Sequence, residues 1–535
     1  MRQLPFLNSP HPTSEILVNR RTLLRIAAVG AVASVAGLAG CAPSATPTSS
    51  ASAGKPQKGG VLTVGMISGG SEETLNPNKL VTGIDAARIQ QVYESAYTFD
   101  NQGNPVPGIV DKATPSADGT SWTLHVREGV TFQDGTPLTA ADIAWSYNYV
   151  LDEANGAYGR GDLLSAGVSS VRAVDSSTVK VSLSAPNFML TFILPRTQLA
   201  IFKNHAVPGA NGKFIGTGPF KLERFVAGER AVFRAYPGYW GGAVNLDGVE
   251  IISLADPSAL ASAIQSGQIL AAASVGYELV GTFKNNPQFH LFNGRSGYFN
   301  AFVMDTQKAP YNDPRVRKAL RLLVDRKQQV TNALSGEGAV ANDLFSWYDP
   351  YYASDIEQIK YDPKQAKALL EEAGVASQTF ELFTTDGSPG MVAAASLFSA
   401  SAESAGVDVK ITKLPYDSYI AIAYGQKPFW STYWPGLPLV QMWASTLSPN
   451  AQYPETHWHN AQWNELFTKA LAAPNEGNRK RLMAEAQQVL HEGTGYIIPT
   501  FNNQSDVIRS SVGGIKEGPM DPFGGYDFRT AWLKH

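Results

Sequence analysis

Apolar positions in this chain alternate with polar ones, or recur at helical spacing, over most of its length beyond the first sixty residues. Val61–Val64 is a β-branched run bounded by glycines, which predicts a first strand. Apolar spacing over 84–99 predicts a helix, and alternation in Trp122–Val126 predicts a half-buried strand. Thr139 followed by Asp142 predicts a capping box that opens a second helix. Two hairpins with short polar turns are also expected, at 171–183 and 220–235.

The pattern changes after Arg295. A strand over 299–304 and a helix over 313–334 are predicted first. Strands and helices then alternate, which is βαβ-like and indicates a second α/β half from 295 to about 490. The expected elements are helix 364–373, strand 380–384, helix 391–405, strand 407–414, helices 461–472 and 476–490, and strand 497–501. The remaining tail is predicted to be rich in loops.

The first forty residues have the pattern of an export signal. Arg20, Arg21 and Arg25 precede an apolar run rich in alanine and valine, Ile26–Ala39. A positive start and an apolar stretch of about 14 residues describe a secretory signal, and this run is shorter than the ~20 residues that a membrane span needs. The paired arginines resemble a twin-arginine signal, and the residues leave the general and the twin-arginine routes both open.

The residues Leu38–Cys41, which read LAGC, match the bacterial lipoprotein box. In that resemblance the Cys41 thiol receives a diacylglyceryl group, becomes the mature N-terminus and anchors the chain to the outer face of the cytoplasmic membrane. Two acyl chains are enough for stable anchoring. We therefore predict a signal peptide at 1–40 and a flexible tether at 41–58, which consists mainly of Ala, Ser, Thr, Pro and Gly.

Composition narrows the class of protein. With 535 residues, 44% apolar and 17% charged, the chain is typical of two to four globular folding units. Removing residues 1–40 takes away four basic and one acidic residue and leaves 39 basic and 45 acidic residues, a formal charge of −6. An acidic chain argues against a nucleic-acid binder. Cys41 is the one cysteine, so internal disulfides and cysteine-rich metal sites are excluded.

The chain lacks the sequence signatures of common secreted enzymes and cofactor sites. There is no G-x-S-x-G elbow, no H-E-x-x-H helix and no complete phosphate loop or dinucleotide fingerprint. We expect no enzyme activity, no catalytic residues and no cofactor. Two alternatives stay open: a pair of carboxylates placed as in a glycosidase, and a metal held by His457 and His459 on either side of Trp458. We expect local hydrogen bonds at the two histidines and no metal.

Four ordered segments carry a resemblance to a known family. Residues 118–135 read DGTSWTLHVREGVTFQDG, and 216–220 read GTGPF ahead of YPGYWG at 236–241. Residues 311–320 read YNDPRVRKAL and 74–77 read TLNP. Together they resemble extracellular solute-binding protein family 5, which includes the dipeptide-, oligopeptide- and nickel-binding receptors of ABC importers. The similarity extends over about residues 60–535.

The resemblance implies an α/β fold of the type II periplasmic-binding-protein class, with two lobes, an extra subdomain and hinge closure on a ligand. Lobe I would combine 59–88, 213–294 and 498–535, the subdomain would be 89–212, and lobe II would be 295–497. It also implies the partners, which are a small solute, a membrane permease and ATPase subunits. We expect the receptor to be a monomer.

The same resemblance points to the binding cleft. In peptide-binding members a G-W-x-x-D-Y segment lines the cleft, and its aspartate pairs with the ammonium group of the ligand. The matching residues here are Tyr433–Pro438, in which Trp434 keeps the tryptophan and Leu437 replaces the aspartate. By analogy Glu72 or Glu73 would face the cleft and could supply the missing charge, although both also fit solvated loop carboxylates.

Aromatic residues near this segment suggest further ligands. Six of them fall within 34 residues: Trp430, Tyr433, Trp434, Trp443, Trp458 and Trp463. Aromatic faces bind sugars and cationic amines, and they also pack in cores. We predict Trp434, Tyr433, Leu437 and Trp430 as ligand-binding residues. Three functions remain in order of preference: a peptide receptor, a receptor for an oligosaccharide, amine or chelated metal, and a secreted hydrolase.

Overall fold

The computed structural model describes residues 55–67, 70–100 and 102–535. The predicted signal peptide, Cys41 and the tether up to residue 54 lie outside the described residues. No helix among the described residues is long and apolar enough to cross a membrane.

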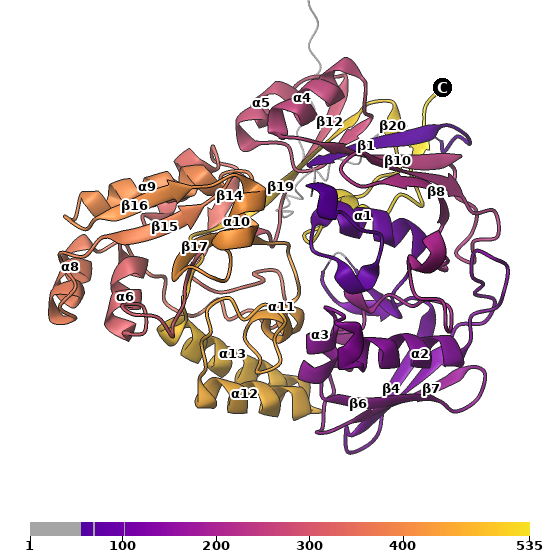
Figure 1. Cartoon of the computed structure of the whole chain (residues 1–535), viewed down its shortest axis with the longest axis horizontal. Coiled ribbons are helices and arrows are strands. Elements are labelled where there is room, and N and C mark those ends of the chain that lie inside the picture. The colour runs from indigo at the N-terminus through magenta and orange to yellow at the C-terminus, as the bar shows by residue number, and fades with distance from the viewer. Residues whose placement is uncertain (1–54, 68–69, 101) are drawn as a thin grey trace, which may run out of the picture. The chain divides into compact units, whose positions relative to one another are not determined.

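The first of three main sheets has eight strands, drawn from both ends of the chain (Figure 1). The strands pair in the order β12-β19-β11-β1-β10-β9-β8, and β14 pairs with β19 off this path. β1 is parallel to β10 and β11, and the other pairs are antiparallel. Its strands are β1 (Val61–Ile67), β8 (Phe220–Val226), β9 (Arg230–Ala235), β10 (Gly248–Leu254), β11 (Ala271–Ala272), β12 (Phe289–Arg295), β14 (Gly338–Val340) and β19 (Thr500–Arg509).

The second sheet has five strands in the order β16-β15-β17-β13-β18. β15 is parallel to β16 and β17, whereas β13 is antiparallel to β17 and β18. Every residue of β13 is buried, as expected of a central strand covered on both faces. The strands are β13 (Phe299–Met304), β15 (Phe380–Thr384), β16 (Val409–Lys413), β17 (Phe429–Trp434) and β18 (Tyr496–Ile497).

The third sheet has four antiparallel strands in the order β4-β5-β7-β6 and packs against α2 (Ala140–Leu151). The predicted capping box is present, since the Asp142 carboxylate accepts from the Thr139 backbone N–H at 2.8 Å. The apolar core of this sheet continues without a break into the core around α11, from Leu124 and Ile143 to Trp443. The strands are β4 (Val110–Pro115), β5 (Ser121–Val126), β6 (Val168–Ala173) and β7 (Thr178–Leu183).

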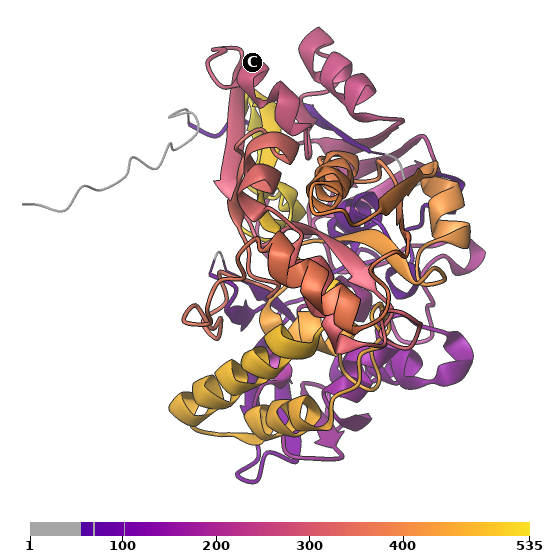
Figure 2. The same cartoon turned by 90° about the vertical axis from the view of Figure 1, so that its left-hand side faces the viewer.

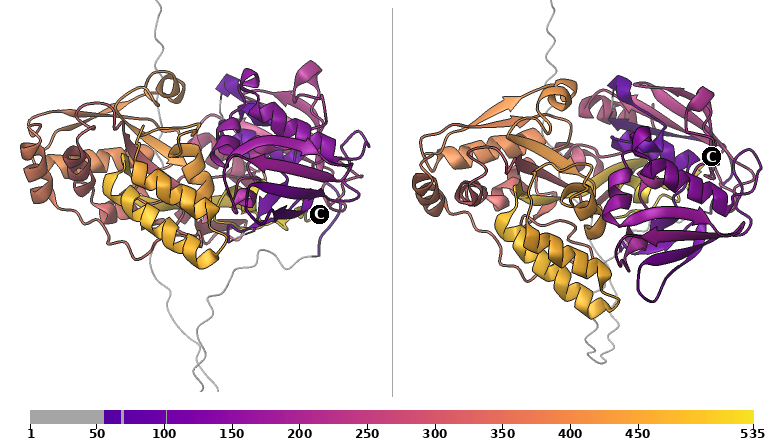
Figure 3. Two further views of the ribbon diagram at one scale, coloured as in Figure 1. Left: turned by 90° about the horizontal axis from the view of Figure 1, so that it is seen from below. Right: turned by 60° about the horizontal axis from the view of Figure 1, so that its bottom comes forward.

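The remaining helices cover these sheets or join their strands. α12 and α13 run side by side in every view (Figures 1, 2 and 3). The helices are α1 (Gly83–Val92), α3 (Arg160–Ser165), α4 (Pro257–Ser266), α5 (Val280–Phe283), α6 (Pro314–Leu322), α7 (Arg326–Gln328), α8 (Pro363–Glu372), α9 (Met391–Glu403), α10 (Tyr416–Ile422), α11 (Leu439–Thr446), α12 (Ala461–Ala472), α13 (Glu476–Gly493) and α14 (Pro522–Tyr526). Two short antiparallel strand pairs are β2 (Tyr97–Phe99) with β3 (Pro105–Pro107), and β20 (Val512–Gly513) with β21 (Trp532–Leu533).

The GTGPF segment explains where α1 ends. The Gly218 N–H donates to the Val92 carbonyl at 2.9 Å, and the Gln133 amide donates to the Gly218 carbonyl at 3.0 Å. The helix predicted over 84–99 therefore stops at Val92, because another part of the chain binds its last turn. Two of the four segments that carried the family resemblance thus meet at the junction between the eight-stranded and four-stranded sheets.

Two further predictions differ from the structure. The helix predicted over 313–334 breaks after Leu322, and Asp325 caps a new helical segment by accepting from the Lys327 and Gln328 N–H groups at 3.1 Å each. The strand predicted over 497–501 is two strands, β18 and the ten-residue β19. β19 reaches well into the tail that was expected to be loop.

Candidate functional site

The eight-stranded and five-stranded sheets are joined by two short crossings of the chain. One runs from β12 to β13 through Ser296–Tyr298, and the other from β18 into β19 through Ile498–Pro499. The first crossing binds the start of β19, since the Asn502 N–H donates to the Tyr298 carbonyl at 2.7 Å and the Ser296 hydroxyl donates to the Asn502 carbonyl at 2.8 Å. Two adjacent crossings of this kind form a natural pivot between two sheets.

The first three residues of β19 pair with a strand that comes from the part of the chain beyond β13. Its residues Thr500–Asn502 pair with β14, whereas 503–509 pair with β12. The Glu337 carboxylate, next to β14, accepts from the Asn293 amide at 2.5 Å and the Asn503 amide at 3.2 Å. A single carboxylate therefore holds the ends of β12 and β19 together beside the pivot.

Tyrosines gather where the two sheets face each other beside the pivot. Tyr298 and Tyr433 stack with ring centroids 6.1 Å apart and an interplanar angle of 26°. The Tyr433 and Tyr416 hydroxyl oxygens are 3.2 Å apart, and the Tyr298 hydroxyl donates to Ser388 at 2.9 Å. Burial raises the pKa of Tyr433, and the adjacent Tyr416 and Tyr298 raise it further. The Tyr433 phenol therefore stays neutral at physiological pH and carries both a ring face and a hydroxyl.

A small cavity of about 10 Å³ lies between the sheets at this point. Tyr277 and Gln504 line it from the eight-stranded side, and Tyr298 and Pro389 from the five-stranded side. Its size leaves room for a water molecule at most. Larger solutes need these walls to separate, which the two short crossings make feasible.

A C-terminal loop closes over the same region from the eight-stranded side. The Pro519 carbonyl accepts from the Gly297 N–H at 2.8 Å, and the Met520 carbonyl accepts from the Gly436 N–H at 3.3 Å. The next residue is Asp521. Burial raises the pKa of Asp521 to about 6, against a lowering by the Arg196 charge. No sequence motif marks Asp521, and our sequence analysis missed it.

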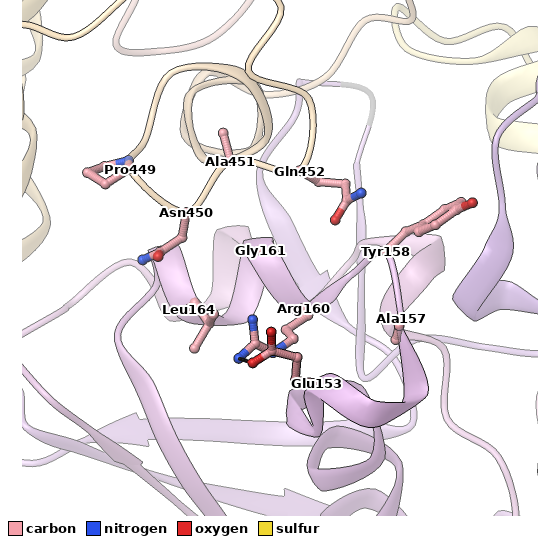
Figure 4. Close-up of a pocket in the computed structure, with 11 residues that line it drawn as sticks. Glu153, Ala157, Tyr158, Arg160, Gly161, Leu164, Pro449, Asn450, Ala451 and Gln452 are labelled. Carbon is pink, nitrogen blue, oxygen red and sulfur yellow. Dashed lines mark hydrogen bonds and ion pairs between the residues drawn. The ribbon is translucent and has the colours of Figure 1, made fainter. Parts of the chain in front are cut away.

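A larger cavity of about 370 Å³ lies between α3 and the loop 449–452 (Figure 4). Tyr158 and Gln452 line it, and Arg160 and Glu153 form an ion pair at 3.3 Å on the α3 side. Gly161 is required where the loop meets α3, because a Cβ there would lie 2.5 Å from the Asn450 carbonyl oxygen. This cavity has the volume of a small-ligand site.

The predicted ligand-binding residues of β17 and of the loop after it fall into two environments. Tyr433 lies in the tyrosine group, and Leu437 lies in the loop that meets Met520, with its carbonyl accepting from Ser346 at 2.6 Å. Trp434 is buried and donates to the Glu455 carboxylate at 3.1 Å. Trp430 is fully buried, and its indole N–H has no partner among the described residues. The structure therefore brings Tyr433 and Leu437 to the region between the sheets and places Trp430 in the core.

Glu72 and Glu73 have different surroundings although they are neighbours. Glu72 is exposed at the end of a short 3-10 helix, Gly70–Glu72. Glu73 is buried and pairs with Arg88 at 2.5 Å, and it also accepts from the Gly228 N–H and the Ser253 hydroxyl. Both side chains of this ion pair are 0% exposed. The role of Glu72 and Glu73 as ligand residues stays a prediction, and Glu73 already has a full set of protein partners.

The other aromatic and histidine candidates lie apart from the tyrosine group. Trp443 and Trp458 both pack against Trp463 in the core. The ring centroids are 5.3 Å apart for Trp443 and Trp463 and 6.1 Å apart for Trp458 and Trp463. His457 faces the Asp305 carboxylate across 3.2 Å, and His459 is exposed. Within residues 55–67, 70–100 and 102–535 no three His, Cys, Asp or Glu side chains are grouped as a metal site would need.

This arrangement has the architecture of a binding protein of the periplasmic type. Solved structures of that class match it. The binding protein DppA from Helicobacter pylori in complex with the peptide STSA aligns with a TM-score of 0.80 at 21% identity, over 90% of this chain and 99% of that one. NikZ from Campylobacter jejuni in complex with Ni(L-His) aligns with a TM-score of 0.78 at 22% identity, over 88% and 99%. The predicted fold class, type II periplasmic-binding-protein-like, is confirmed.

The sequence places the chain in a particular family. Residues 104–463 match the family described as bacterial extracellular solute-binding proteins, family 5. The chain belongs to this family, as its four ordered segments had indicated.

Two curated relatives illustrate the range of the family. The nickel-binding periplasmic protein of Escherichia coli (strain K12) is 31% identical over 310 residues, which span 56% of this chain and 59% of that protein's length. The di/tripeptide-binding protein 2 of Pseudomonas aeruginosa (strain UCBPP-PA14) is 24% identical over 493 residues, or 82% and 91%. Both relatives are named as binding proteins.

Proposed function

We propose that this chain is the substrate-binding component of an ABC importer, which captures a solute outside the cell and delivers it to a membrane permease driven by ATPase subunits. One observation carries the proposal: two sheets joined by two adjacent short crossings face each other across a group of tyrosines. A receptor needs such a pivot, because closure buries the solute and marks the loaded state for the permease. The receptor acts as a monomer.

In this proposal the sheets belong to two lobes. Lobe I comprises 59–88, 213–294 and 498–535 and contains most of the eight-stranded sheet. Lobe II comprises 295–497 and contains the five-stranded sheet, and the subdomain at 89–212 contains the four-stranded sheet. Closure rotates the lobes about Ser296–Tyr298 and Ile498–Pro499. The solute then lies between Tyr433 and the C-terminal loop.

Peptides are the favoured solute class. Support comes from relatives named for di- and tripeptides and from a neighbouring structure that holds the peptide STSA. A non-peptide solute, such as an oligosaccharide, an amine or a chelated metal, is the second candidate. It is favoured by Leu437, which stands where peptide-binding members carry an aspartate, and by the neutral tyrosine faces, which suit sugar rings and cations.

A ligand screen by thermal unfolding tests this function. A solute at 100 times its dissociation constant stabilises the folded protein by about 2.7 kcal/mol. Purified protein starting at Gly59 is expected to gain stability with di- to pentapeptides. A gain in stability with sugars or amines alone would instead favour the second candidate, a receptor for a non-peptide solute. Consumption of any solute during the assay would instead favour the remote alternative of a secreted hydrolase over a receptor without enzyme activity.

The proposal includes a lipid anchor at Cys41 that holds the receptor at the outer face of the cytoplasmic membrane. Cys41 follows the predicted signal at 1–40, and the tether at 41–58 would let the domain move above the membrane. Cells that express Cys41→Ala are expected to release the protein from the membrane fraction, whereas wild type sediments with membranes. Equal membrane retention of both proteins would contradict the anchor.

A further inference from the structure

The C-terminal loop that carries Asp521 contacts the residue before Leu437. The Met520 carbonyl accepts from the Gly436 N–H, so Asp521 follows a backbone contact made by the residue before Leu437. Tyr348 also binds Gly436, because its hydroxyl donates to the Gly436 carbonyl at 2.5 Å. A carboxylate from the C-terminal loop is thus placed beside the position where peptide-binding members carry one on the other lobe.

Among the described residues no hydrogen-bond donor reaches the Asp521 carboxylate, whereas its acidic neighbours have donors. Asp506 accepts from the Ser274 and Phe523 N–H groups at 2.9 Å each, and Asp349 accepts from the Leu439 N–H at 2.8 Å. Asp521 precedes α14 but makes no side-chain capping bond, and the described residues give it no ion pair within 4.0 Å. The Asp521 carboxylate therefore keeps its acceptor positions for a solute.

The charges around Asp521 leave a net negative balance. Arg196 is the basic side chain whose charge acts on it, and the Arg196 Nε already donates to Asp162 at 3.1 Å. Asp162, Arg196 and Asp521 together carry one unbalanced negative charge. The neighbouring Tyr348 and Tyr526 are neutral, since burial raises the pKa of both. A carboxylate with this surrounding charge balance attracts a cation.

We propose that Asp521 binds the ammonium group of the solute and so replaces the carboxylate that Leu437 has removed. The inference rests on the proposed receptor function and narrows its solute to molecules that carry a protonated amine. The ammonium lies between Asp521 on lobe I and the Gly436–Leu437 loop on lobe II. Closure of the lobes is then coupled to recognition of the ammonium group. The Asp521 carboxylate on lobe I reaches the solute only when the two lobes come together.

The test compares free and blocked amines on wild type and two variants. The probe is the di- to pentapeptide fraction of a tryptic casein digest, used as such and after N-acetylation, with thermal unfolding followed against concentration. The free fraction is expected to stabilise wild type. The acetylated fraction should need at least a tenfold higher concentration to give the same stabilisation. The Asp521→Asn variant is expected to need at least a tenfold higher concentration of the free fraction than wild type for the same stabilisation. Glu517→Gln removes a charge from the same loop and is expected to respond like wild type.

Each other outcome decides between the inference and the function. If wild type binds free and acetylated peptides equally, or if Asp521→Asn binds the free fraction as wild type does, the role of Asp521 is overturned and the receptor function stands. The wild-type comparison gives this answer even if Asp521→Asn does not fold. If only amine-free solutes bind, the amine requirement fails and the receptor function again stands. If no solute binds, both fail.

Discussion

Gly216 lies so close to the end of α1 that a Cβ on it would be 2.0 Å from the Val92 carbonyl oxygen. Gly218 is similarly close, at 2.6 Å from the Gln91 carbonyl oxygen. The backbone of the GTGPF segment therefore packs directly on the last turn of a helix, which no residue with a side chain permits. This contact fixes α1 against the segment that leads into β8 of the eight-stranded sheet.

Gly216→Ala is expected to destabilise the protein by about 3 kcal/mol, because the methyl group meets backbone that cannot move aside. Gly281→Ala is the matched control, since a Cβ at that helical position meets nothing within 4 Å. Urea unfolding should show a large loss for the first variant and no loss for the second. Equal stability of the two would contradict the close packing on α1.

Glu73→Gln is expected to cost about 3–5 kcal/mol, since it leaves the Arg88 guanidinium buried without its charge partner. The exposed neighbour supplies the control, and Glu72→Gln is expected to leave stability unchanged. Unfolding and peptide titrations should be measured on both variants. A folded Glu73→Gln protein of normal stability but weak ligand binding would assign Glu73 to the ligand and not to the fold.

Acidification is expected to stabilise the protein through Asp349. Burial raises the pKa of Asp349 to about 6, although the Leu439 and Tyr351 N–H groups oppose this. The folded state thus holds a proton that the unfolded state releases near pH 4. The resulting stability is complete below pH 4 and is lost as pH rises through 6, by about 3 kcal/mol at most. Asp349→Asn should flatten this part of the stability curve between pH 4 and 7, and an unchanged slope would contradict the assignment.

Tyr433→Ala is expected to weaken binding of the tightest peptide found in the screen at least tenfold. The change removes the ring that stacks on Tyr298 and that is proposed to line the solute site. Tyr433→Phe keeps the ring and loses the hydroxyl contact with Tyr416, and it should keep most of the affinity. Isothermal titration measures both. Normal affinity in the alanine variant would place the solute elsewhere, for example in the cavity of about 370 Å³ beside α3.

Much of the fold followed from local patterns. The capping box at Thr139, the strand over 380–384 and the helix over 461–472 appear as predicted, because short-range spacing and capping determine them. The first helix ends seven residues early, since Gly216–Gly218 binds its last turn. The length of β19 was underestimated because its residues Asn502–Asp506 are polar, yet most of them are buried where β19 pairs with β14 and β12.

The site was less accessible to sequence reasoning. Tyr433 and Leu437 came from a family segment, and the structure places them between the sheets. Asp521 carries no motif, and it becomes significant only because its loop folds back onto Gly436. Glu73 looks the same as Glu72 in the sequence, and long-range packing alone gives it Arg88 as a partner. Contacts between residues far apart in the chain leave no local signal.

The place of β19 has a consequence for the order of biosynthesis. Within the part of the chain that the structure describes, β12 pairs only with β19 in the eight-stranded sheet, and β19 also borders β11, the strand next to β1. The strand that joins them is the last long one to leave the ribosome. Until it emerges, β12 and β11 present unpaired edges, which are prone to wrong pairing. These edges of the growing chain therefore stay open to wrong pairing until β19 has emerged.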